Sequence, residues 1–306
     1  MLSRFRKEVA AVELYGKLPI AKDYLRVGGA EENGIAFRDW LDRGFSPTRG
    51  GEHRPSLAWP GRFIISDHLG DPLMGCCWPS GDSGGLRPFP FTTFLSRRKK
   101  PLLAAWEDGG VALRPLWEEM TGVFTAHRSY GDGESYLAAM RGRSLSIPKP
   151  DEGPPQRVDF TAWVSSVWPE GGQEELVDVL AALKRRGAHE GPIRLPIVAG
   201  LPTVPQVHAW WLALTELELL STEEVPTAFF PLRDDELSAP LFVAFFRGPL
   251  QPSDQSWLAA PDSKLGPGDF ASRVIRAVAD APPVSEATPP LAESMRGPLI
   301  SARSRA

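Results

Sequence analysis

Hydrophobic residues fall into short runs separated by proline, glycine and charged residues, a pattern typical of many short strands and helices. In the first half of the chain it predicts strands over residues 12–16, 62–66, 73–78 and 89–95. It also predicts helices over residues 34–45, 114–126 and 133–140. The last three of these strands follow one another through short connections, so we expect them to be antiparallel neighbours.

The second half alternates between helix and strand. The pattern predicts helices over residues 158–167, 173–186, 203–220, 254–260 and 270–279, and strands over residues 193–198, 227–232 and 241–246. Thr203 and Gln206 form a capping box at the start of the third helix, whose apolar stripe includes Trp210 and Trp211. This alternation after an antiparallel group predicts an α/β fold, a three-layer α/β/α sandwich with a mixed, partly antiparallel sheet.

Residues 147–157 contain four prolines among the first ten positions and cannot hold regular structure, so they are the predicted internal boundary. We therefore expect a first α/β region over residues 1–146 and a proline-rich linker over 147–157. A second α/β region follows over 158–280, and its strands are compatible with the same sheet. Residues 281–306 are rich in Pro, Ser, Ala and Arg, a composition that predicts a disordered tail.

Composition narrows the function classes. The formal net charge is −4, so no excess of positive charge attracts phosphate backbones, and we do not expect a nucleic-acid partner. The two cysteines, Cys76 and Cys77, are adjacent and show no metal-ligand spacing, so neither a disulfide nor a metal site is expected. We find no signal-peptide-like start and no apolar run long enough to span a membrane, and therefore expect a cytoplasmic protein without direct membrane insertion.

Candidate chemistry is concentrated in residues 75–92, which read as a strand, a tight loop and a second strand. The loop presents Ser80, Asp82 and Arg87 between two apolar runs, the type of place where binding and catalytic residues often lie. With His68, Ser80 and Asp82 would supply the residue types of a hydrolytic triad. Ser80, however, is not in a Gly-x-Ser-x-Gly elbow.

Cys76 or Cys77 is the second candidate nucleophile, with His127, His189 or His208 as a base. Cysteines in an apolar strand are more often small core residues. The glycines of residues 81–85 match neither the Walker pattern nor the dinucleotide fingerprint, so no nucleotide or other cofactor is expected.

The remaining polar clusters favour structural roles. The basic run at residues 97–100 and the acidic run at 234–236 predict solvated turns rather than a phosphate patch and a divalent-cation site. His208 has no second ligand at i+4, which favours a core or boundary position over a metal site.

Several segments together resemble one family, in the same order and with similar spacing. They are residues 15–19 (YGKLP), 23–26 (DYLR), 37–41 (FRDWL), 62–63 (RF), 79–82 (PSGD), Arg87 and 89–91 (FPF). This set is similar to the Y-G-K-L-P-x-x-x-D-[FY]-[LV]-R opening and the P-S-x-D-x-x-G-R-x-F-P-L segment of the type VI secretion-associated TagF family, also called ImpM. The chain departs from that pattern by an insertion between the family's adjacent Gly and Arg.

The resemblance implies a compact α/β fold and a non-enzymatic accessory protein that represses the type VI secretion machine after translation. Members are thought to act by binding a forkhead-associated scaffold protein, beside a threonine kinase and phosphatase switch. We accordingly predict a partner-binding surface made of six residues. They are Lys17, Asp23, Arg26, Ser80, Asp82 and Arg87.

Alternatives remain open at this point. Asp23 and Asp82 are equally compatible with stabilising their own loops. A cytoplasmic hydrolase that uses Ser80 or Cys77 is the alternative from another class. A third possibility is an interaction protein unrelated to secretion that uses exposed residues among its 10 tryptophans.

Overall fold

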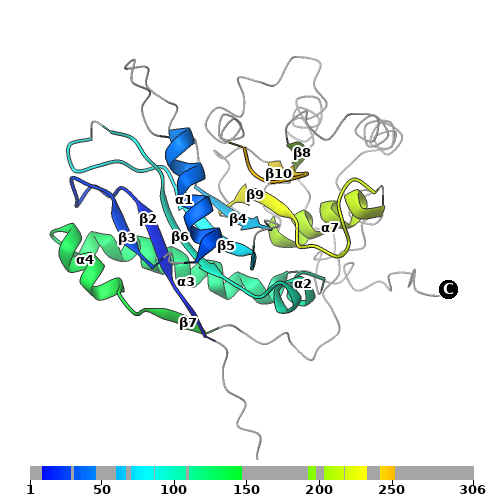
Figure 1. The fold of residues 1–306 in the computed structure, drawn as a ribbon, viewed down its shortest axis with the longest axis horizontal. Coiled ribbons are helices and arrows are strands. Elements are labelled where there is room, and N and C mark those ends of the chain that lie inside the picture. Colours follow the sequence, from blue (N-terminus) through cyan, green and yellow to red (C-terminus); the bar gives the residue numbers. More distant parts are fainter. Residues whose placement is uncertain are drawn as a thin grey trace, which may run out of the picture.

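The structure, a computed structural model of the 306-residue chain, describes residues 9–28, 31–45, 60–66, 70–85, 87–107, 110–146, 192–197, 203–216, 218–232 and 242–251. Most of the described strands belong to one eight-stranded sheet (Figure 1). In spatial order its strands are β3 (Leu25–Val27), β2 (Glu13–Gly16), β6 (Phe91–Ser96), β5 (Leu73–Trp78), β4 (Gly61–Ile65), β9 (Thr227–Pro231), β10 (Phe242–Phe246) and β8 (Ile193–Pro196). Strands β1 (Val9–Ala11) and β7 (Ser144–Ser146) form a separate two-stranded sheet.

The described strand pairs are all antiparallel. The α/β class and the antiparallel order of β4, β5 and β6 are therefore confirmed. The sequence predicted a mixed sheet, but no parallel pair occurs among the described strands, so their sheet is antiparallel. For β4 and β5, antiparallel pairing follows from the short connection over residues 66–72, which leaves no room for a crossover helix.

The described helices are distributed along the whole chain. They are α1 (Glu32–Phe45), α2 (Lys99–Glu107), α3 (Arg114–Thr125), α4 (Gly133–Met140) and α7 (Thr203–Glu216), with 3₁₀ turns η1 (Val111–Leu113) and η2 (Ala126–Ser129). Asp132 caps α4 by accepting a hydrogen bond from the Ser135 backbone N–H at 2.8 Å. Within the described residues, no helix combines the length and apolarity needed to cross a bilayer.

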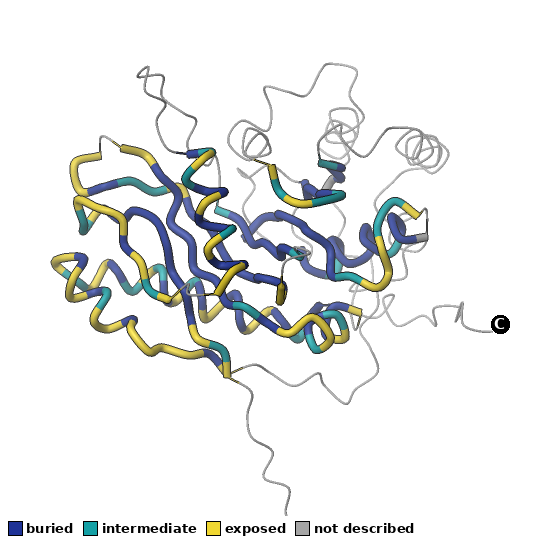
Figure 2. Tube along the Cα trace, in the orientation of Figure 1, coloured by how far each residue is buried: buried dark blue, intermediate teal, exposed yellow. Residues whose placement is uncertain are grey.

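The sheet is buried on both faces because its strands alternate between two apolar clusters. On β5, Met74 and Cys76 pack in the cluster that contains Trp117 of α3, whereas Cys77 packs in the cluster that contains Phe37 of α1. Successive side chains of a strand point to opposite faces, so α1 and α3 cover opposite sides of the sheet. Figure 2 shows the resulting buried centre, with exposed positions toward the periphery.

Gly16 fixes the join between the sheet and the loop that follows β5. Its φ of +134° lies in a region that favours glycine, and a Cβ there would collide with the Pro90 carbonyl oxygen and approach Phe91 Cα to 2.7 Å. The end of β2 therefore lies directly against the start of β6.

Several described elements were missing from the sequence prediction. It did not include strands β1, β3 and β7, helix α2 or the 3₁₀ turns η1 and η2, and residues 97–100, expected to form a solvated turn, in part begin α2. Arg97 is buried, which corrects the prediction for that position, whereas Arg98 is exposed as a turn residue would be.

Several predictions lie outside the described residues. They are the helices at 158–167, 173–186, 254–260 and 270–279, the linker at 147–157, the tail at 281–306, the acidic run at 234–236, His68 and His189.

Candidate functional site

The candidate site lies where the β5–β6 loop, residues 79–90, meets the β2–β3 turn, residues 17–24. The Ser83 backbone N–H donates to the Ala21 carbonyl at 2.9 Å, and the Ser80 hydroxyl donates to the Lys17 carbonyl at 2.6 Å. These bonds join segments more than 60 positions apart in sequence. We call the joined pair of segments the loop–turn site.

The β5–β6 loop is also closed on itself. The Phe89 N–H donates to the Ser80 carbonyl at 3.0 Å, and the Gly85 N–H donates to the Asp82 carbonyl at 2.9 Å. Gly81 and Pro88 form an antiparallel bridge between these bonds. The loop is thus an extension of the β5–β6 hairpin with a defined backbone path.

Arg87 connects the loop to the turn through its side chain. Its Nε lies 2.5 Å from Asp82 Oδ2, and its Nη2 donates to the Lys22 carbonyl at 2.5 Å. The exposed Asp23 carboxylate lies farther away, 4.0 Å from Nη2. The hydrogen bond to Asp82 raises the pKa of Arg87, so the guanidinium is a permanent cation that remains half-exposed, at 49%.

Lys17 lies beneath this pair. Its side chain is buried, and its Nζ is 3.9 Å from Asp82 Oδ2 and 4.7 Å from the centre of the Tyr24 ring. Burial lowers the pKa of Lys17, and the neighbouring Arg87 lowers it further, while Asp82 and Asp23 oppose both effects. Asp82 is therefore a buried carboxylate shared by two cations.

Three aromatic rings form the floor of the loop–turn site. Tyr24 stacks on Tyr15 with ring centres 5.6 Å apart and meets the edge of Phe89 at 4.8 Å. The Tyr15 hydroxyl donates to Asp42 Oδ1 of α1 at 2.7 Å, and burial raises the pKa of Tyr15. Tyr24 stays 37% exposed, so the site offers an aromatic surface beside its charges.

The structure brings five of the six predicted residues together and sets Arg26 beside them. Arg26 lies on β3 opposite Tyr15 and is exposed, as are Asp23 and Arg87. Lys17 and Asp82 are buried, a position that fits stabilisation of the loop from within. Asp23 and Arg87, with Arg26, are thus the predicted residues that a partner could reach most directly.

The residues of the hydrolase alternative have structural contacts. Ser80 already donates its hydroxyl proton to a backbone carbonyl. Cys77 is buried, its Sγ is 3.5 Å from the Gly61 carbonyl oxygen, and burial raises its pKa to about 12. Burial raises the pKa of Cys76 as well.

The described histidines also lie in buried surroundings. His127 Nδ1 is 2.6 Å from the Phe124 carbonyl oxygen, and His208 lies among the rings of Trp106 and Trp211. The prediction of a core position for His208 is therefore confirmed. In the part of the chain that the structure describes, no group of three or more His, Cys, Asp or Glu side chains could hold a metal ion.

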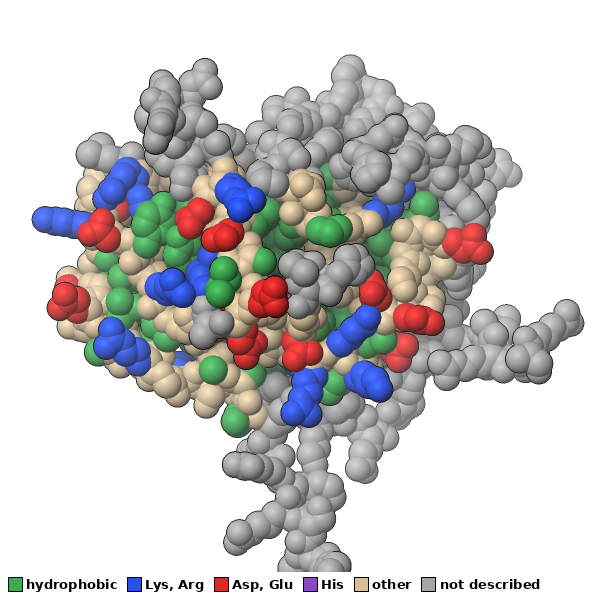
Figure 3. Space-filling model, in the orientation of Figure 1, with side chains coloured by type: hydrophobic (Ala, Val, Ile, Leu, Met, Phe, Trp, Pro, Cys, Tyr) green, Lys and Arg blue, Asp and Glu red, His purple; other side chains and the backbone are tan. Residues whose placement is uncertain are grey.

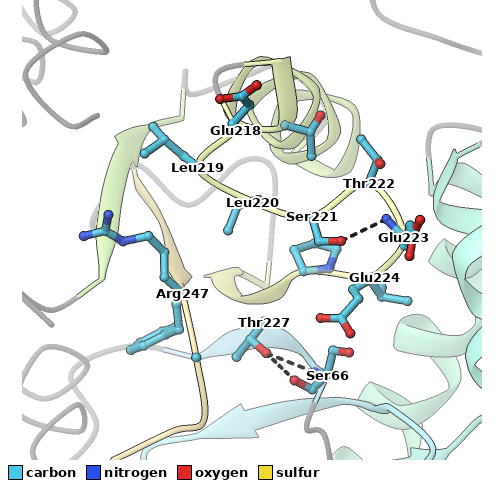
Figure 4. A pocket seen from close by; sticks show the side chains of 15 residues that line it. Ser66, Glu218, Leu219, Leu220, Ser221, Thr222, Glu223, Glu224, Thr227 and Arg247 are labelled. Atoms are coloured by element: carbon cyan, nitrogen blue, oxygen red, sulfur yellow. Dashed lines mark hydrogen bonds between the residues drawn. The ribbon is translucent and has the colours of Figure 1, made fainter. Parts of the chain in front are cut away.

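A second feature, not predicted from the sequence, is a cavity of about 530 Å³ beside Ser66, which directly follows β4 (Figure 4). Its lining also includes the segment from Glu218 to Thr227, and Arg247. Thr227 and Ser66 hydrogen-bond across its base at 3.0 Å, and Glu224 pairs with Lys99 at 3.1 Å. Its walls come from separate segments without a shared motif, so no sequence signal marked it.

Lys22 and Tyr24 belong to the loop–turn site but are not among the six predicted residues, although both lie in the segment from Lys17 to Arg26 that the predicted surface includes. Tyr24 had a signal, because it stands inside the 23–26 segment of the family resemblance, but its exposure depends on how it stacks on Tyr15. The Lys22 carbonyl had none, since backbone contacts leave no trace in side-chain patterns.

No family model matches the sequence, and no curated protein matches it. The crystal structure of PA0076 from Pseudomonas aeruginosa PAO1 is similar, with 16% sequence identity and a TM-score of 0.44. The match covers 84% of this chain and 97% of that chain.

Proposed function

We propose that this protein is a cytoplasmic, non-enzymatic accessory protein of a type VI secretion system and that it represses assembly of the system after translation. It does so by binding a forkhead-associated scaffold protein. The resemblance of residues 15–26 and 79–91 to the TagF family supports the partner class. We further propose that α1, the sheet and α3 are the three layers of an α/β/α sandwich that carries the binding surface.

The observation that carries the proposal is the fixed, half-exposed guanidinium of Arg87. Asp82 holds its Nε at 2.5 Å and the Lys22 carbonyl holds its Nη2, while 49% of the side chain remains accessible. An arginine held in place loses less side-chain entropy when it pairs with a partner carboxylate or phosphate. Arginine and tyrosine are also enriched in protein interfaces, and Tyr24 lies in the same site.

The surroundings of Ser80 and Cys77 favour binding over hydrolysis. A nucleophile needs an adjacent base and an accessible reacting atom. The Ser80 hydroxyl instead donates a hydrogen bond to the Lys17 carbonyl, and the Cys77 thiol is buried with a raised pKa. Both side chains therefore support the loop and the core rather than a reaction.

A calorimetric titration against the forkhead-associated scaffold of the same organism tests the proposal, with phosphorylated and unphosphorylated scaffold run separately. We expect saturable binding to the wild-type chain and weaker binding to Arg87→Ala. Arg114→Ala is the matched control, because Arg114 is also exposed and ion-paired, at 2.8 Å to Glu118, but lies on α3. Absence of binding by the wild type contradicts the proposed function; equal affinity of Arg87→Ala and wild type removes Arg87 from the surface.

A further inference from the structure

Arg87 is bound unequally by its two acidic neighbours. Asp82 is buried and lies 2.5 Å from Nε, with Lys17 on its other side. Asp23 is 91% exposed and lies 4.0 Å from Nη2, at the outer limit of an ion pair. Asp82 is therefore a structural anchor, whereas Asp23 is a weak and solvent-screened one.

The outer side of the guanidinium still has donor capacity. Nε and Nη2 make the contacts to Asp82, Lys22 and Asp23. Nη1 makes no hydrogen bond or ion pair within the described part of the chain. Arginine carries five N–H donors in a planar fork, so Nη1 and the second Nη2 hydrogen can donate two hydrogen bonds to a carboxylate in bidentate geometry.

A second basic residue adjoins this fork through its backbone. Lys22 is exposed, and its carbonyl is the group that Nη2 of Arg87 contacts. Its ammonium has no ion-pair partner among the described residues. Figure 3 shows basic and acidic side chains next to one another at the left margin of this face, over the β2–β3 turn and the β5–β6 loop. The chain has a net charge of −4, but here two exposed basic residues, Lys22 and Arg87, lie beside one exposed acidic residue, Asp23.

We infer that the loop–turn site takes a carboxylate of an acidic partner segment between Arg87 and Lys22, and that Asp23 is the internal anion which this carboxylate displaces. The inference rests on the proposed function and names the chemistry that its surface recognises. Asp82 keeps the guanidinium in place during the exchange, because its contact is on the opposite edge of the fork and is shielded from solvent. The exposed part of the Tyr24 ring supplies apolar contact beside the carboxylate.

Displacement has a consequence that a simple contact role for Asp23 does not have. If Asp23 touched the partner directly, its loss would weaken binding. As a competitor for Arg87, its loss strengthens binding. Exposed ion pairs are typically worth 1 kcal/mol or less, so Asp23→Asn is expected to tighten binding by about two- to fivefold. Arg87→Ala is expected to weaken it by roughly tenfold or more, and Lys22→Ala by a smaller factor.

The test is a double-mutant cycle, measured by calorimetry against the unphosphorylated scaffold, with wild type, Asp23→Asn, Arg87→Ala and the double variant. We expect Asp23→Asn to tighten binding in the wild-type background and to have no effect when Arg87 is absent. Unchanged or weaker binding by Asp23→Asn overturns the inference while leaving the proposed function intact. If only phosphorylated scaffold binds, the site selects phosphate, and the assignment to a carboxylate is also overturned.

A scaffold-independent probe separates the two failures. If the wild type does not bind scaffold at all, the proposed function fails, and titration with hexaglutamate decides the inference. Hexaglutamate should then shift the Arg87 Nε–Hε resonance and should bind Asp23→Asn more tightly than wild type. Hexalysine is the control and should leave the resonance unchanged. No shift, or equal affinity for the two chains, overturns it.

Discussion

The Glu13 carboxylate lies 4.0 Å from the Arg38 guanidinium, and both side chains are buried between β2 and α1. Two residues along the strand, Tyr15 makes the equivalent link to Asp42, one helical turn after Arg38. The two pairs match the two-residue repeat of a strand to the four-residue spacing of a helix face. They attach α1 to the sheet through polar groups at the margin of its apolar contact.

Burial makes Glu13 a source of pH dependence. Desolvation raises its pKa to about 7 against the pull of Arg38; Glu31 adds to the rise and Arg26 opposes it. The native state therefore binds this proton more tightly than the unfolded chain does, and the free energy of unfolding falls as pH rises from about 4.5 to about 7. The expected contribution is about 3 kcal/mol at most.

Denaturant unfolding between pH 4.5 and pH 8 measures this effect, with Glu13→Gln as the comparison. The substituted side chain of Glu13→Gln cannot ionise, so the free energy of unfolding of this variant should not show this fall between pH 4.5 and pH 7. Its absolute stability at one pH is not diagnostic, because it also changes the counter-ion of Arg38. Parallel pH profiles for the two chains would show that Glu13 does not titrate in this range.

Among substitutions in the loop–turn site, replacement of Asp82 should lower the free energy of unfolding most. Asp82→Ala leaves the buried Lys17 cation without this counter-ion and releases Arg87 from its anchor. We expect the free energy of unfolding to fall by about 2–4 kcal/mol, close to the cost of removing one partner of a buried ion pair. Asp23→Ala is the control, because its 91% exposed carboxylate should change stability by no more than about 0.5 kcal/mol. Equal effects from the two substitutions would contradict the anchoring role of Asp82.

Gly75 and Gly122 provide a matched pair of glycine substitutions. A Cβ at Gly75 in β5 would lie 2.5 Å from the Phe63 ring and 2.8 Å from Phe94 Cβ. At Gly122 in α3 it would meet nothing within 4 Å. Gly75→Ala should cost at least about 1–3 kcal/mol through overpacking, whereas Gly122→Ala should gain up to about 1 kcal/mol from helix propensity. Thermal unfolding of both variants checks this, and a stabilising Gly75→Ala would refute the close packing of β5 against β6.

Much of the fold was predictable where local chemistry and tertiary structure agree. Strand β5 (Leu73–Trp78) has the predicted bounds because Pro72 and Pro79 flank an unbroken apolar run. Helix α4 (Gly133–Met140) likewise matches, since Asp132 provides its cap. In both cases the signals that start and end the element lie within a few residues of it.

The missing elements depend on distant partners. Strand β3 has three residues, too few to show a periodicity, and exists because β2 pairs with it. In the loop–turn site, Asp82 and Arg87 are close enough in sequence for their pairing to be a reasonable guess. Their contacts with Lys17 and Lys22 cross about 65 positions and depend on the neighbouring positions of β2 and β6 in the sheet. The sequence thus indicated residues that lie close together in the structure, without indicating which of them are buried.

Thiol reactivity offers a direct check on the environment of Cys77. Its pKa of about 12 leaves roughly one thiolate in ten thousand at pH 8, and its side chain is buried, as is that of Cys76. We expect a thiol-exchange reagent such as dithionitrobenzoate to label the native protein at a negligible rate at pH 8. After unfolding in guanidinium chloride, the reagent should release two equivalents of thionitrobenzoate per chain, because the chain has two cysteines. Rapid labelling of the native chain that disappears in Cys77→Ala would show an accessible thiolate, and the hydrolase alternative would then regain support.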